Sequence, residues 1–288
     1  MRMRLAVVAS MLLLWAPGVH AQPAPSYTTK VVTVPSGGLK LRALLGRPTG
    51  EGPFPAYISN HGSMTIEEAK REPWTSITKG SLSDTLARQG YVVLVLARRG
   101  YKGSEGAAST YTQSQTSGTY SGRRAVDVMR GAEEETGDVL AALDYLLTLP
   151  YVDKDRVAVG GTSLGGLVSV MAASREPRFK ALISMAGGYR QGGQVGTDEA
   201  WPLVQRAWKE AARRLQAPVL ILWSKNDTLL QEDEGRQLEK ELRRAGKSVE
   251  MKVYPAFQDN GHHLFTQPEG YPVFVPDAVS FLDAHLKR

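Results

Sequence analysis

The chain has 288 residues, of which 42% are hydrophobic and 22% charged. This composition fits one globular domain with a sizeable core and excludes fibrous and disordered proteins. The formal net charge is +6, but Lys and Arg are interleaved with Asp and Glu along the chain, so we expect no nucleic acid partner.

The first 21 residues have the pattern of a secretory signal peptide. A basic start precedes an apolar run from Leu5 to Trp15, and small residues follow up to Ala21. The apolar run is shorter than the roughly 20 residues that a membrane-spanning helix needs. We therefore expect cleavage after Ala21. Residues 22–288 then form a single periplasmic or secreted domain without stable membrane insertion.

The elements predicted after this leader alternate between strands and helices. The segments YTTKVVTV and LKLRALLGRP flank a Pro-Ser-Gly-Gly turn and predict an antiparallel start. Further strands are expected in PAYISNHG, YVVLVLARRG, RVAVGGTS, FKALISMAGG, PVLILWSKND and VEMKVYPAF. Helices are expected at residues 83–89, 133–147, 164–174, 200–215, 232–245 and 276–286. This alternation predicts an α/β fold, with a mostly parallel central sheet flanked by helices on both faces.

Two segments need a separate interpretation. Residues 102–126 are polar and too long for an ordinary connection, so they form either a surface loop or a flap over a site at the carboxyl end of a strand. The helix at 200–215 carries one apolar stripe, which is either core or the wall of a substrate pocket. The stripe consists of Trp201, Val204, Trp208, Ala211 and Leu215.

Ser163 lies at a strand-to-helix bend and is surrounded by glycines. The segment Gly161-Thr162-Ser163-Leu164-Gly165 matches the nucleophile-elbow pattern G-x-S-x-G in the context that the pattern requires. Glycines beside the serine let strand and helix pass closely. The glycines are not followed by the Lys-Ser or Lys-Thr of a phosphate-binding loop. We therefore predict that Ser163 is a catalytic nucleophile; a structural glycine-rich turn is the alternative.

A serine nucleophile needs a histidine base and a carboxylate that orients it. His262 and His263 follow the last predicted strand, and Asp227 follows the strand PVLILWSKN. The order serine, acid, histidine is the one expected with a nucleophile elbow. We predict Asp227 as the acid, although it could instead cap the next helix. His262 is the predicted base, with His263 as the alternative.

Backbone amides are expected to hold the oxyanion. The N–H groups of Ser63, after the strand YISN, and of Leu164, after the nucleophile, are the candidates. His61 is interpreted as a structural residue that braces this loop. The sequence has no cysteine and shows no further ligand cluster beside the paired histidines, so we expect neither a metal nor a cofactor.

These motifs together resemble the α/β-hydrolase superfamily, and within it the dienelactone hydrolase-like and prolyl oligopeptidase-like branch. The likeness rests on SNHGS, LARQGYVVLVLARRGYKGSEG, GGTSLGG, LWSKND and NGHHLF. In this branch the histidine usually follows a glycine and precedes a short apolar stretch ending in phenylalanine, which supports His262. Dienelactone hydrolases proper use cysteine at the elbow, whereas this chain has Ser163 there.

The predicted function is therefore that of a small serine hydrolase acting through an acyl-enzyme on a small-molecule ester. A peptidase or amidase with the same triad is the rival within enzymes. A binding protein that kept the fold and lost activity is the rival from another class. The intact order of Ser163, Asp227 and His262 argues against the inactive alternative.

Overall fold

A computed structural model describes residues 26–64, 66–71, 74–109, 125–190 and 199–287. The predicted signal peptide lies outside these residues. Within them, eight strands form one sheet in the order β1-β2-β4-β3-β5-β6-β7-β8. The described part of the chain contains no helix long and apolar enough to cross a membrane.

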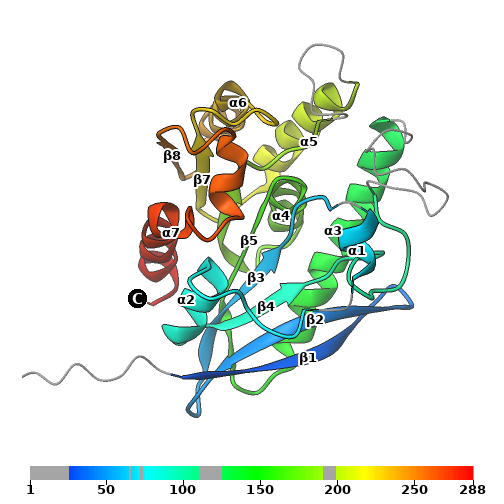
Figure 1. Cartoon of the computed structure of the whole chain (residues 1–288), viewed down its shortest axis with the longest axis vertical. Coiled ribbons are helices and arrows are strands. Elements are labelled where there is room, and N and C mark those ends of the chain that lie inside the picture. The colour runs from blue at the N-terminus through cyan, green and yellow to red at the C-terminus, as the bar shows by residue number, and fades with distance from the viewer. Residues whose placement is uncertain (1–25, 65, 72–73, 110–124, 191–198, 288) are drawn as a thin grey trace, which may run out of the picture.

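The sheet is antiparallel at one edge and parallel elsewhere. β1 pairs antiparallel with β2, and β2 pairs antiparallel with β4, while all the other pairings are parallel. Figure 1 shows the β1–β2 hairpin at one side of the molecule and β7 and β8 at the other. The strand bounds are β1 Tyr27–Ser36, β2 Leu39–Pro48, β3 Phe54–Asn60, β4 Val92–Leu96, β5 Val152–Thr162, β6 Phe179–Met185, β7 Val219–Ser224 and β8 Val249–Tyr254. The predicted mostly parallel α/β fold is confirmed.

Helices cover both faces of the sheet, as predicted. α2 and α7 pack together on one face, and α3, α4 and α5 contact one another on the opposite face, where α6 packs beside α5 (Figure 1). The helix bounds are α1 Ile66–Lys70, α2 Leu82–Arg88, α3 Ala125–Leu147, α4 Leu164–Arg175, α5 Ala200–Arg214, α6 Glu232–Arg244 and α7 Tyr271–Leu286; a 3₁₀ helix, η2, spans Gly261–Phe265. Buried apolar side chains of sheet and helices form one continuous core.

The structure corrects two predicted helix starts. α3 begins at residue 125 rather than 133, because Val128 and Ala132 continue its buried stripe toward the N-terminus. α7 begins at Tyr271 rather than at Pro276. Proline is tolerated in the first turn of a helix, where its missing N–H has no intrahelical acceptor, so Pro272 favours this earlier start.

Of the two segments with open interpretations, the helix at 200–215 is settled by its burial, and residues 102–126 are described only in part. In α5, Val204, Trp208 and Ala211 are buried in the core, and so is Leu215 after its end. Trp201 is partly buried and packs against the same core, so the stripe is core rather than pocket wall. Residues 102–109 pack against the rest of the protein: Lys102 donates its N–H to the Ala69 carbonyl, at 2.6 Å. Residues 110–124 lie outside the described part of the chain, and the flap prediction stays a prediction.

Candidate active site

Ser163 lies at the junction of β5 and α4 with a left-handed backbone. Its φ is 56° and its ψ is −126°, a conformation that an L-residue rarely adopts. Hydrogen bonds hold both of its peptide groups: its N–H donates to the Met185 carbonyl at 2.9 Å, and its carbonyl accepts from Gly188 N–H at 3.1 Å. The neighbouring strand β6 and the turn after it therefore enforce the strained bend that presents the hydroxyl.

The glycines around Ser163 are required by close backbone contacts. A Cβ atom on Gly165 would lie 2.3 Å from the carbonyl oxygen of His61, and one on Gly161 would lie 2.5 Å from that of Asn60. Real Cβ contacts do not fall below 3.0 Å. The glycine cluster thus lets the end of β3 pass directly over the elbow, which brings the loop after β3 beside the hydroxyl.

Asp227 and His262 meet at the ends of β7 and β8. The Nδ1 atom of His262 lies 2.8 Å from Oδ2 of Asp227, and both side chains are buried. The other carboxylate oxygen, Oδ1, accepts the N–H groups of Leu229 and Leu230, at 2.9 and 2.8 Å. Asp227 therefore contacts the histidine with one oxygen and the backbone of its own loop with the other, while the N-cap of α6 is Gln231. His263, next in the chain, is exposed.

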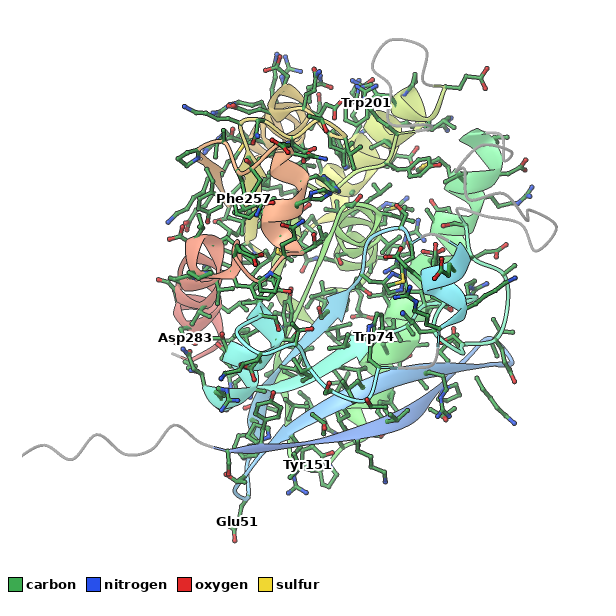
Figure 2. The ribbon with its side chains drawn as sticks, in the orientation of Figure 1. Glu51, Trp74, Tyr151, Trp201, Phe257 and Asp283 are labelled. Carbon is green, nitrogen blue, oxygen red and sulfur yellow. The ribbon has the colours of Figure 1, made fainter. Side chains whose placement is uncertain are left out.

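Two asparagines that the sequence analysis did not single out join the acid loop to the histidine loop. The Oδ1 atom of Asn260 accepts the N–H of Thr228 at 3.1 Å and that of His262 at 3.0 Å. The Asn226 side chain bonds to the backbone of the segment after β8, accepting from the N–H of Phe257, labelled in Figure 2. Both asparagines lie within two residues of Asp227 or His262, in the segments SKND and DNGHH, and this closeness could have marked them as supports of the site.

The predicted oxyanion donors are Leu164, next to the nucleophile in the chain, and Ser63, on the loop after β3. Leu164 is the first residue of α4, so its N–H has no acceptor within the helix. Ser63 follows β3 and lines the same cavity as Ser163. A Cβ on Gly62 would lie 3.3 Å from the Cβ of Ser163, which shows how closely this loop approaches the elbow.

Several of these residues line one cavity of about 880 Å³. Ser163 and His262 both line it, together with His61, Ser63 and His263. Apolar side chains supply much of the remaining wall. They are Leu44, Met64, Trp74, Ile77, Val95, Leu229, Leu230 and Tyr271, of which Trp74 is labelled in Figure 2. The volume and the apolar wall fit a small organic molecule.

A buried ion pair borders the cavity after β6. Arg190 lines the cavity and pairs with Glu234 of α6, and the guanidinium also lies over the ring of Trp201, 4.7 Å from its centroid. Trp201 projects from the first turn of α5 (Figure 2). Across the described ranges, no group of three or more His, Asp or Glu side chains is arranged to hold a metal ion.

The sheet order, the elbow and the acid–histidine pair together define an α/β-hydrolase fold. A model of the dienelactone hydrolase family matches residues 75–279, more than two thirds of the sequence. The chain belongs to the dienelactone hydrolase family.

Individual relatives carry different names. Dipeptidyl-peptidase 5 of Porphyromonas gingivalis is 27% identical, over 70% of this chain and 30% of its own length. The uncharacterized peptidase YtmA of Bacillus subtilis is 23% identical, over 82% of this chain and 88% of its own length. A Synechocystis protein named as a carboxymethylenebutenolidase is 27% identical, over 55% of this chain and 58% of its own length. The chain therefore spans less than a third of the first relative.

A solved structure with a similar fold is the acylaminoacyl peptidase of Pyrococcus horikoshii. The TM-score is 0.67 at 19% identity, over 91% of this chain and 42% of that one. At this identity the likeness shows a shared fold.

Proposed function

We propose that this chain is a serine hydrolase that cleaves carboxylic esters through an acyl-enzyme. The observation that carries the proposal is the 2.8 Å contact between Asp227 and His262 in a cavity that Ser163 also lines. An oriented histidine beside a serine on a strained elbow is the arrangement that activates a hydroxyl.

In the proposed mechanism, Ser163 Oγ attacks the ester carbonyl carbon and its proton passes to Nε2 of His262. Asp227 accepts the Nδ1–H and stabilises the imidazolium that forms. The N–H groups of Ser63 and Leu164 donate to the oxyanion. His262 returns the proton to the leaving alcohol as the acyl-enzyme forms. Water then attacks with the same base, and the acid product leaves.

The charges of the cavity favour a neutral ester over the free N-terminus of a peptide. A bound ammonium group needs a carboxylate partner, because an unpaired charge is costly to take out of water. Among the described residues that line the cavity, Glu68 is the one carboxylate, and it is exposed. This supports ester hydrolysis rather than aminopeptidase-type activity.

The test uses a fluorophosphonate probe and two substrate series. We expect the probe to label the wild type and not Ser163→Ala, because it reacts only with an activated serine. Nitrophenyl esters should be hydrolysed at least about 100-fold faster, in kcat/KM, than aminoacyl anilides. Faster anilide cleavage would indicate the peptidase, and an unlabelled wild type would indicate the inactive binding protein.

We also propose export, on the sequence of residues 1–21 alone. A periplasmic or secreted enzyme would meet esters that arrive from outside the cell. Mass analysis of the exported protein should give an N-terminus at Gln22. Recovery of the protein with residues 2–21 intact would contradict the proposal.

A further inference from the structure

Arg98, two residues after β4, forms an ion pair in the protein interior. Its Nε atom lies 2.7 Å from Oε2 of Glu135 in α3, and both side chains are fully buried. Such a pair is costly to desolvate and adds little stability over apolar residues of the same size. Its Nη2 atom also has no hydrogen-bond partner among the described residues. A buried pair of this kind is therefore weak evidence for a role in stability.

The guanidinium of Arg98 reaches the loop that carries the proposed oxyanion donor. Nη1 of Arg98 donates to the carbonyl oxygen of His61 at 2.8 Å, while Oε1 of Glu135 accepts the N–H of Ser109 at 2.9 Å. One planar guanidinium thus connects α3 to the residue before Gly62. A lysine ammonium is a single point of charge and does not reproduce this fork.

His61 continues the connection to the next peptide group. Its Nδ1 atom lies 2.6 Å from the carbonyl oxygen of Gly62. Burial, and then the charge of Arg98, hold the pKa of His61 well below its usual range. The ring is therefore neutral near pH 7, with a single ring N–H. Since the contact to a carbonyl oxygen requires a donor, that proton sits on Nδ1.

The contact with Gly62 fixes the direction of the Ser63 amide. In a trans peptide group the C=O and the following N–H point in opposite directions. With the Gly62 carbonyl turned toward the His61 ring, the Ser63 N–H is turned away from it. Within the described residues this N–H donates no hydrogen bond, and Ser63 lines the cavity beside Ser163.

We propose that Arg98, Glu135 and His61 are positioning residues that hold the Ser63 amide ready for the oxyanion. The inference rests on the proposed function, and it identifies the residues that orient one donor of the oxyanion hole. Donors that are already oriented stabilise charge without reorganisation as it develops. Loss of the Arg98 fork should therefore weaken transition-state stabilisation more than substrate binding.

The test compares Arg98→Lys with Arg99→Lys. Arg99 makes the same kind of link, pairing with Asp138 and Glu134 of α3, but among the described residues it has no hydrogen bond or ion pair with the loop after β3. On nitrophenyl acetate, Arg98→Lys should lower kcat about 10- to 100-fold with KM within about twofold and an unchanged acidic limb of the pH–rate profile. Arg99→Lys should change each value by less than about twofold.

A trifluoromethyl ketone gives an independent readout. The Ser163 oxygen adds to the ketone carbon, its proton passes to His262, and the ketone oxygen becomes an oxyanion in the hole. Its Ki should rise in Arg98→Lys by about the factor by which kcat falls. If that variant does not fold, the double variant Arg98→Met with Glu135→Gln removes both charges, keeps an acceptor for Ser109, and should show the same loss.

The outcomes separate the two proposals. If the wild type reacts with fluorophosphonate but folded Arg98 variants keep kcat and Ki, the positioning role is overturned. Equal losses in Arg99→Lys would also overturn it, because they would show a general effect of α3 docking. A wild type that neither turns over esters nor takes the label overturns the proposed function, and this inference with it.

Discussion

Asp227 contacts His262 through one carboxylate oxygen and holds its own loop with the other. Oδ2 lies 2.8 Å from the ring nitrogen, and Oδ1 accepts two backbone N–H groups, from Leu229 and Leu230. The loop of Asp227 thus holds the carboxylate independently of its contact with the histidine. The position and tautomer of the histidine then follow from a rigid partner.

The two adjacent histidines should differ sharply when each is replaced. His262→Ala removes the ring that contacts Asp227, so kcat should fall about 10³-fold or more. His263 is exposed at the cavity wall, so His263→Ala should lower kcat by less than about tenfold. Ester turnover of both variants, with circular dichroism to confirm folding, checks this. The reverse pattern would assign the base to His263.

Asn260 should matter for the base although it does not line the cavity. Asn260→Ala leaves the N–H groups of Thr228 and His262 without their shared acceptor. We expect kcat to fall about tenfold and the free energy of unfolding to fall by about 1–2 kcal/mol. Asn260→Asp keeps the acceptor and should restore most of the activity. If Asn260→Ala retains full kcat, the histidine loop does not depend on this residue.

Two neighbouring residues of the sheet form part of the cavity wall. Leu44 of β2 and Val95 of β4 are register partners, and both line the cavity. Val95→Phe adds bulk to the cavity wall on β4, whereas Ser163 follows β5. We expect kcat/KM for an octanoate ester to fall at least about tenfold while that for acetate stays within about twofold. Parallel loss on both esters would show that long chains bind elsewhere.

Two helical glycines should respond to alanine in opposite directions. A Cβ on Gly165 of α4 would lie 2.3 Å from the His61 carbonyl oxygen, whereas one on Gly137 of α3 meets no atom within 4 Å. Gly165→Ala should lower the free energy of unfolding by more than about 2 kcal/mol. Gly137→Ala should raise it by about 0.5–1 kcal/mol. Urea unfolding measures both; similar values would refute the close approach.

The depressed pKa of His61 makes stability depend on pH. Burial and the Arg98 charge keep the folded pKa below that of the unfolded chain, so the unfolded state binds more protons below about pH 6.5. The free energy of unfolding should therefore fall as pH drops from 6.5 to 5, by at most about 1.4 kcal/mol per unit from this group. His61→Asn keeps a donor for Gly62 and should show a shallower slope. Equal slopes would mean that His61 does not contribute.

The elements with the strongest sequence signals were predicted well because their patterns reflect local physics. The G-x-S-x-G turn needs glycine wherever backbones touch, so Gly161 and Gly165 mark the elbow directly. The strands alternate with amphipathic helices in a way that admits few topologies. Helix starts were harder to place, since residues 125–132 continue α3 although they follow a polar segment.

The supports of the site could not be predicted from spacing. Arg98 and Glu135 are 37 positions apart. Arg98 is also followed by a second arginine, Arg99, and nothing in the sequence indicates which of the two is fully buried. Their pairing depends on how α3 crosses the end of β4, which only the tertiary fold determines. The choice between His262 and His263 likewise depends on which of the two rings points toward Asp227, and this direction is set by the conformation of the loop.

The asparagine links between the acid and histidine loops have a consequence for heat inactivation. Asn226 and Asn260 join these two loops to each other, whereas Ser163 is fixed by β5, β6 and α4 in the centre of the sheet. Mild warming should displace the linked loops as one unit, with the Asp227–His262 bond intact, while the core stays folded. Turnover would then fade below the melting temperature and return in full on cooling.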